Sequence, residues 1–207
     1  MVITYLAAGF VKVTFGDTVI ALNPVSKGEG AKAARFGADV ALVSVPLPAF
    51  DGVSGLTGGG KEPFVIDGPG EYEYADIFIK GYPSVGPNDT VNTIYSFLLE
   101  GMRVVSLGVL AKNELSPETI EDISGADILI APAGDEGSLS GRLAGKLASS
   151  LEPKIIIPVL HGGMKSAGLK EFMDEAGEPA GGPEEKLSIK KKDLEGKEAA
   201  VVVLETV

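Results

Sequence analysis

The stretch Asp67-Gly68-Pro69-Gly70-Glu71-Tyr72-Glu73 is the most distinctive part of this sequence. Its Pro-Gly centre predicts a tight turn, because glycine accepts the positive φ that such turns require. The residues on either side of the turn predict strands over 64–67 and 71–74. A functional alternative places Asp67 or Glu71 at the edge of a pocket, and the spacing is compatible with both interpretations.

The sequence before this turn is rich in strand-like segments. Strands are predicted over 2–6, 10–15 and 18–22, and the Gly16-Asp17 turn signal indicates an antiparallel meander. A short helical turn is predicted over 31–36, followed by a buried strand over 40–45. Residues 46–63 lack periodicity and are rich in Pro, Gly and Ser, which predicts a long surface loop.

Beyond the turn, the pattern changes from strands to alternating helices and strands. Strands are predicted over 77–82, 93–99 and 103–107, and Ser116 before Pro117 indicates a capped helix that runs to Ile123. Further helices are predicted over 138–151 and 169–176, and further strands over 128–131, 155–159, 187–190 and 199–204. This order predicts an α/β protein with two sheets face to face and helices outside, a four-layer αβ/βα sandwich in a single domain of residues 1–207.

The charge and the apolar content exclude two classes of partner. The formal net charge is −11, and such a field opposes binding to nucleic-acid phosphates and to anionic lipid. The lysine run 190–192 is interpreted as an exposed turn because its surroundings are acidic. The apolar runs are too short to span a bilayer, so no membrane association is expected. The chain has no cysteine, and the cytoplasm is the expected location.

Three short motifs resemble known signatures but lack an essential part. Gly55–Lys61 matches a phosphate-binding loop, yet Glu62 stands where the motif needs Ser or Thr and a strand follows in place of a helix. The G-x-G-x-x-A match at 28–33 lies too far from the preceding strand for a dinucleotide site. The string 137–141 has Leu139 at the position of the nucleophilic serine.

His161 is the only histidine of the chain. Zinc in proteins takes three or four ligands, mainly from histidine, cysteine and carboxylates. With one imidazole and no thiolate, a zinc site would consist mostly of carboxylates, which is an unusual set. The sequence therefore predicts no zinc site and no cofactor. A single histidine after an apolar strand is more typical of a turn with an ordinary hydrogen bond than of a catalytic group.

The order of these segments resembles the metallo-β-lactamase superfamily, in particular its small zinc-dependent hydrolase branch that includes ascorbate-phosphate lactonase-like proteins. The resemblance covers residues 1–176. It rests on the order and spacing of the following motifs: Tyr5-Leu6, Asn23-Pro24, the string 67–73, Asn92-Thr93-Ile94-Tyr95, Ser106-Leu107-Gly108, and Leu151-Glu152-Pro153-Lys154 before Pro158.

This resemblance implies metal ligands at the strand ends, and the sequence departs from the family pattern there. The positions that correspond to the ligands are Ala8, Asn23, the segment Ser44–Phe50, Gly86, the segment Ser106–Val109, and the segment Pro158–Leu160 with His161 one place late. The family uses its metals to produce hydroxide near neutral pH, so no inherited hydrolytic chemistry is expected. Apolar side chains are expected to fill the former metal cavity, namely Val45, Leu47, Phe50, Val109 and Leu160.

Two main functional hypotheses follow. The first is a non-catalytic protein that has lost its zinc site and acts as a scaffold, as a partner subunit in a homo-oligomer or with another protein, or as a binder of a small molecule. The second is a hydrolase of this superfamily that keeps the cleft with zinc-independent or weakly metal-dependent chemistry. Its candidate cleft residues are Asn23, Asp51, Ser84, Ser106 and His161. Metal binding through carboxylates alone is a third, minor hypothesis.

Overall fold

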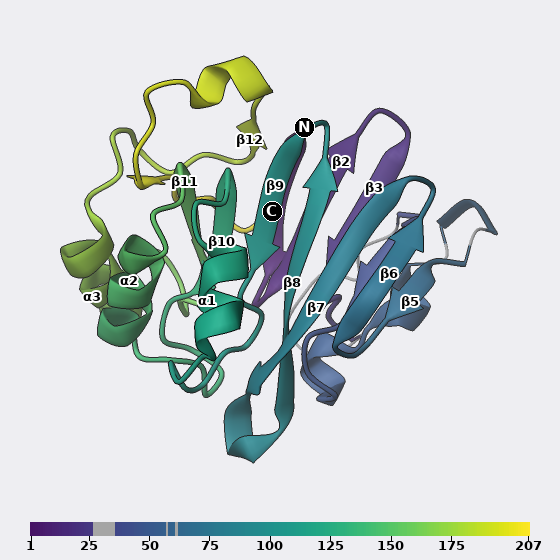
Figure 1. The fold of residues 1–207 in the computed structure, drawn as a ribbon, viewed down its shortest axis with the longest axis horizontal. Coiled ribbons are helices and arrows are strands. Elements are labelled where there is room, and N and C mark those ends of the chain that lie inside the picture. The colour runs from purple at the N-terminus through teal and green to yellow at the C-terminus, as the bar shows by residue number, and fades with distance from the viewer. Residues whose placement is uncertain (27–35, 57, 61) are drawn as a thin grey trace.

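A computed structural model describes residues 1–26, 36–56, 58–60 and 62–207, and it contains two β-sheets packed against each other (Figure 1). The first sheet has the order β12-β1-β2-β3-β4-β5. Its strands are β12 (Leu187–Ser188), β1 (Val2–Ala7), β2 (Phe10–Phe15), β3 (Thr18–Leu22), β4 (Val40–Leu42) and β5 (Phe64–Ile66). The strands β1, β2 and β3 pair antiparallel, which confirms the predicted meander.

The second sheet has the order β13-β11-β10-β9-β8-β7-β6. Its strands are β13 (Ala200–Val201), β11 (Ile155–Val159), β10 (Ile128–Pro132), β9 (Met102–Ser106), β8 (Val91–Leu99), β7 (Ile77–Val85) and β6 (Gly70–Tyr74). Every residue of β10 and β11 is buried, because the first sheet covers one face of these strands and helices cover the other.

Three α-helices lie together on the outer face of the second sheet: α1 (Pro117–Ile123), α2 (Gly141–Ser150) and α3 (Ala167–Ala176) (Figure 1). Ser116 caps α1 as predicted, since its Oγ accepts a hydrogen bond of 3.1 Å from the Thr119 backbone N–H. The helix predicted over 138–151 begins later, at Gly141, because Ser140 provides its N-terminal cap.

Three hydrophobic clusters correspond to the layers of the fold. The largest lies between the sheets and contains side chains of both, such as Val13 and Ile20 of the first sheet and Phe97 and Ile130 of the second. Another joins the second sheet to the helices. The third lies on the outer face of the first sheet, where Leu56 packs on it. The predicted α/β sandwich, with two sheets face to face and helices outside them, is therefore confirmed.

Several predicted boundaries differ from the observed ones. The loop predicted over 46–63 contains short 3₁₀ turns at Pro48–Phe50, Val53–Gly55 and Gly58–Gly60. The strands β7 and β8 are longer than predicted, because they continue pairing as far as Val85 and Val91. The strands predicted over 187–190 and 199–204 shorten to two residues each. The predicted helical turn at 31–36 lies, except for Phe36, outside the described residues. Within the described part of the chain, no helix has the length and apolar character to cross a membrane.

Candidate functional site

The loops that follow β1, β3, β4, β9 and β11 meet at one end of the two sheets. The Leu160 backbone N–H donates to the Ala8 carbonyl at 3.1 Å, and the Thr93 N–H donates to the Ser44 carbonyl at 2.8 Å. A Cβ atom added to Gly9 would lie 3.4 Å from Asn23 Nδ2, 3.5 Å from Phe50 Cε1 and 3.6 Å from Leu160 Cδ1. The fold therefore brings together Ala8, Asn23, Phe50 and Leu160, which are among the positions that correspond to the family's metal ligands.

Apolar side chains fill this region. Val45, Phe50, Val109 and Leu160 are each at most 1% exposed and belong to the core cluster between the sheets. Leu47 is partly buried and packs against the same cluster. These five residues occupy the hydrophobic core as predicted.

Asn23 connects the end of β3 to the segment after β4. Its φ of 47° lies in the left-handed region, which asparagine tolerates better than most residues. Its side chain is buried, and Oδ1 accepts a hydrogen bond of 2.8 Å from the Ser44 N–H. Asn23 therefore satisfies a buried backbone donor, which is a structural task.

Asn92 has a similar task and was not among the candidate residues predicted from the sequence. It is fully buried; its Nδ2 donates to Ser84 Oγ at 2.8 Å and to the Leu107 carbonyl at 3.0 Å. Its Oδ1 accepts from the Val109 N–H at 2.9 Å. The amide therefore supports the loop after β9. Asn92 belongs to the motif Asn92-Thr93-Ile94-Tyr95, but this motif does not indicate the role of its side chain.

The two candidate serines also use their hydroxyl groups locally. Ser84 Oγ donates to the Asn92 carbonyl at 3.0 Å. Ser106 Oγ accepts a long hydrogen bond of 3.4 Å from the Gly108 N–H. Ser44, which lies beside Gly108, has a buried Oγ with no hydrogen-bond partner among the described residues. None of these hydroxyls forms a hydrogen bond with His161, so the imidazole is not placed to activate any of them as a nucleophile.

His161 lies directly after β11 and is only 3% exposed. Its Nδ1 accepts a hydrogen bond of 3.1 Å from the Gly163 N–H, and its ring packs at a centroid distance of 5.3 Å against Tyr5. Burial lowers the pKa of His161, and the charge of Asp135 offsets this shift only in part. An Nδ1 that accepts a hydrogen bond leaves the proton of the neutral ring on Nε2, which has no partner among the described residues.

Tyr5 holds the loop before β2 and the end of β11 together. Its hydroxyl donates to the Ala8 carbonyl at 2.5 Å and accepts from the Leu160 N–H at 3.2 Å. Burial raises the pKa of Tyr5 to about 12, so the hydroxyl stays protonated and remains a donor.

The five candidate cleft residues lie in different surroundings and are not joined to one another. Asp51 is exposed after the turn Pro48–Phe50, whereas the other four are at least partly buried. Within the described part of the chain, no hydrogen bond or ion pair joins any two of Asn23, Asp51, Ser84, Ser106 and His161.

The donor atoms at this end of the sheets do not fit zinc. Among the described residues, no three His, Cys, Asp or Glu side chains are placed to hold a metal ion. The single imidazole already uses Nδ1 as an acceptor, and the Asn23 amide, the Ser44 and Ser106 hydroxyls and the five apolar side chains occupy the other positions. Zinc requires three or four nitrogen, sulfur or carboxylate ligands, so this set is insufficient.

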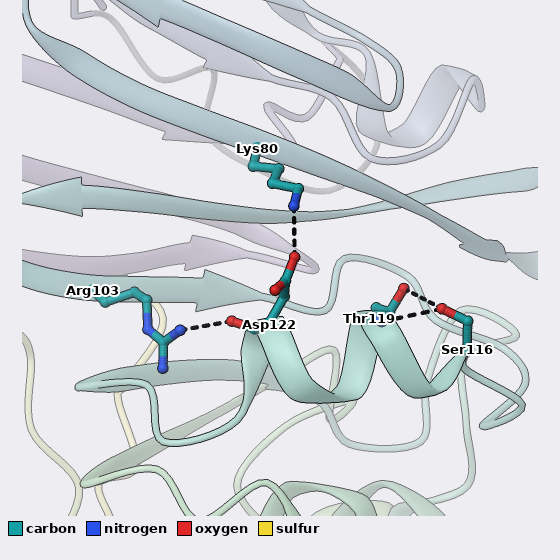
Figure 2. Close-up of polar contacts among 5 residues, drawn as sticks. All are labelled: Lys80, Arg103, Ser116, Thr119 and Asp122. Atoms are coloured by element: carbon teal, nitrogen blue, oxygen red, sulfur yellow. Dashed lines mark hydrogen bonds and ion pairs between the residues drawn. The ribbon is translucent and has the colours of Figure 1, made fainter.

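A second group of polar residues lies on the outer face of the second sheet, next to α1 (Figure 2). Lys80 Nζ lies 2.6 Å from Asp122 Oδ2, and this contact raises the pKa of Lys80 and lowers the pKa of Asp122. The Arg103 guanidinium donates to the carbonyls of Asp122, at 2.6 Å, and of Ser124. These contacts attach the C-terminal end of α1 to the sheet. Glu71, a predicted pocket-edge candidate, lines an open groove here with a volume of about 520 Å³.

Comparison with known proteins gives consistent results at the level of families and folds. The family model described as beta-lactamase superfamily domain matches residues 2–160. None of the curated proteins matches the chain.

Three solved structures share the fold over nearly the whole chain. A candidate Zn-dependent hydrolase of the metallo-beta-lactamase superfamily from Thermotoga maritima is 25% identical, with a TM-score of 0.77 over 100% of this chain and 99% of the other. A candidate metal-dependent hydrolase from Parabacteroides distasonis is 17% identical, with a TM-score of 0.69 over 99% and 93%. The metallo hydrolase Igni18 from Ignicoccus hospitalis is 16% identical, with a TM-score of 0.60 over 99% and 94%.

Proposed function

The chain belongs to the metallo-β-lactamase superfamily, and from this membership we propose that it is a non-catalytic member that has lost its zinc site. It acts as a scaffold, as a partner subunit or as a binder of a small molecule. The proposal includes a cytoplasmic location, which suits a chain without cysteine. One observation carries the proposal: packed apolar side chains occupy the end of the sheets where the family pattern requires metal ligands.

The chemistry of the replaced residues supports the loss of hydrolysis. The family mechanism needs a metal that lowers the pKa of bound water and polarises the scissile bond. The side chains of Val45, Phe50 and Leu160 have neither a lone pair to bind a metal nor an acidic proton to transfer. Two of the polar side chains in this region, Asn23 and Asn92, direct their amide oxygens at backbone N–H groups.

Burial also argues against the alternative of a hydrolase with altered, zinc-independent chemistry. Among the described residues, the one buried side-chain nitrogen without a hydrogen-bond partner is Nε2 of His161, and an imidazole can act as a general base. A general base must reach the proton that it removes, either directly or through one water molecule. With 3% exposure and Tyr5 against its ring, His161 is shielded from a substrate in the present conformation.

Elemental analysis tests the proposal directly. The protein is purified with zinc or manganese present and dialysed, and its metal content is measured. We expect far less than one equivalent of either metal. One tightly retained equivalent would contradict the proposal.

A substrate panel tests the same proposal independently of metal content. Phosphodiester, lactone and thioester substrates are offered to the wild type, to His161→Ala and to the control Asp17→Asn, whose side chain is exposed in the turn between β2 and β3. We expect no turnover above background in any of them. Turnover that Asp17→Asn retains and His161→Ala loses would establish the alternative hydrolase.

A further inference from the structure

The outer face of the second sheet is only partly covered by helices. The helices lie in front of β9, β10 and β11, and α1 also reaches Lys80 on β7 through Asp122, whereas β6 and the upper part of β8 have no helix in front of them (Figure 1). Phe78 on β7 is 62% exposed, and Leu98 on β8 is 51% exposed. They are neighbours, because each lies one place beyond the paired residues Ile79 and Phe97. These two large apolar side chains form one contiguous exposed patch on the sheet.

Charged residues continue this apolar pair on both sides. Glu73 on β6 is the register partner of Phe78, and Arg103 on β9 is the register partner of Leu98. Glu73, Phe78, Leu98 and Arg103 therefore form one row across four strands, called here the β6–β9 row. Its sequence of properties is acid, apolar, apolar, base.

The charges at the two ends of the β6–β9 row are available. Glu73 is exposed and forms no ion pair with a described residue. The Arg103 guanidinium donates to two backbone carbonyls, which carry no net charge and do not neutralise it. A guanidinium has five N–H donors, so others remain for a partner. The neighbouring Asp122 carboxylate pairs with Lys80 and not with Arg103. Arg103 therefore keeps a positive charge that no described carboxylate neutralises through an ion pair.

We propose that the β6–β9 row is the contact surface for a second copy of this chain. The two copies place these faces opposite each other, related by a two-fold axis that runs parallel to the strands over the gap between β7 and β8. With this axis, β6 of one copy faces β9 of the other. Glu73 then faces Arg103 of the second copy, and Phe78 faces Leu98. Each contact occurs twice, which is the property of a two-fold symmetric interface.

The same order of charges explains why a second copy fits better than an unrelated surface. A partner with uniform charge would meet a like charge at one end of the row, whereas an identical row turned about the axis meets opposite charges at both ends. The net charge of −11 repels two copies over most of the surface, so a local pair of opposite charges decides which faces meet. The open groove beside Phe78 and Leu98 leaves room for side chains of the second copy.

The mass in solution tests the proposal. Light scattering on the whole chain at about 100 µM, well above the Kd of a micromolar complex, is expected to give twice the 21.3 kDa of the chain. Phe78→Asp is expected to weaken association at least tenfold, as for a central interface residue. Val91→Asp is the control, because Val91 is also on β8 and is 55% exposed but lies outside the row.

Disulfide cross-linking tests the predicted geometry, since the natural chain has no cysteine. Phe78→Cys and Leu98→Cys are prepared separately, mixed and oxidised. The mixture is expected to give more cross-linked dimer than either variant by itself, because residue 78 faces residue 98 across the axis. A monomeric wild type overturns the proposal, whatever else binds this face. A dimer that Phe78→Asp leaves intact, or equal cross-linking of the mixture and the single variants, also overturns it. The result is independent of the metal content.

Discussion

Replacement of Phe50 tests whether the former metal region is a packed core. Phe50 is 1% exposed, and its ring lies beside Gly9 and Leu160. Removal of a buried phenylalanine ring typically costs about 3–5 kcal/mol of unfolding free energy. Phe50 ends the short turn Pro48–Phe50, which is held by one backbone hydrogen bond of 2.8 Å to Leu47, so the turn can move partly into the space. We therefore expect Phe50→Ala to lose about 3 kcal/mol, the lower end of this range.

Thermal and urea unfolding, followed by circular dichroism, measure this loss. For a chain of this length, about 3 kcal/mol lowers the melting temperature by roughly 6–12 °C. Phe15→Ala is the matched control, because Phe15 is 40% exposed and its replacement is expected to cost less than about 1 kcal/mol. A loss in Phe50→Ala no larger than that of Phe15→Ala would refute the packing argument and reopen the case for a functional cavity.

Two further predictions concern the helices and His161. Gly168→Ala places a Cβ 2.4 Å from the Ala133 carbonyl oxygen. It is expected to lower the free energy of unfolding, measured in urea, by about 2 kcal/mol or more. Gly182→Ala is the control, because its Cβ meets nothing within 4 Å and the change should be nearly neutral. Burial lowers the pKa of His161 in the folded state below the ordinary 6.5. As the pH falls, the imidazole of the unfolded chain is therefore protonated before that of the folded chain. The free energy of unfolding then decreases as the pH falls below about 6.5. In His161→Phe this part of the pH dependence should disappear. The measurement is the free energy of unfolding of the wild type and of His161→Phe between pH 7 and 5, and identical slopes against pH would count against a buried neutral imidazole.

Local signals predicted most of the elements because their causes lie within a few residues. Ser116 and Pro117 start α1 through one side-chain hydrogen bond and one fixed φ angle, and both are visible in the sequence. The turn at Gly68-Pro69-Gly70 separates β5 from β6 for a similarly local reason. The composition also limited the metal chemistry, since one histidine and no cysteine cannot supply a zinc site of the usual kind.

Contacts between distant segments decided the remaining features. The last two strands join different sheets, β12 beside β1 and β13 beside β11, and only the packing of the whole chain makes these edges available. Asn92 became a central residue because Ser84, Leu107 and Val109 surround it in space.

The sequence by itself determined the strand and helix types, the family resemblance and the shortage of metal donors, because each depends on residue identity and short spacing. Only the tertiary structure decided that His161 is buried against Tyr5 and that Glu73 and Arg103 end one row across the sheet. The physical reason is that burial and register arise from pairings between segments far apart in the chain, which no local pattern encodes.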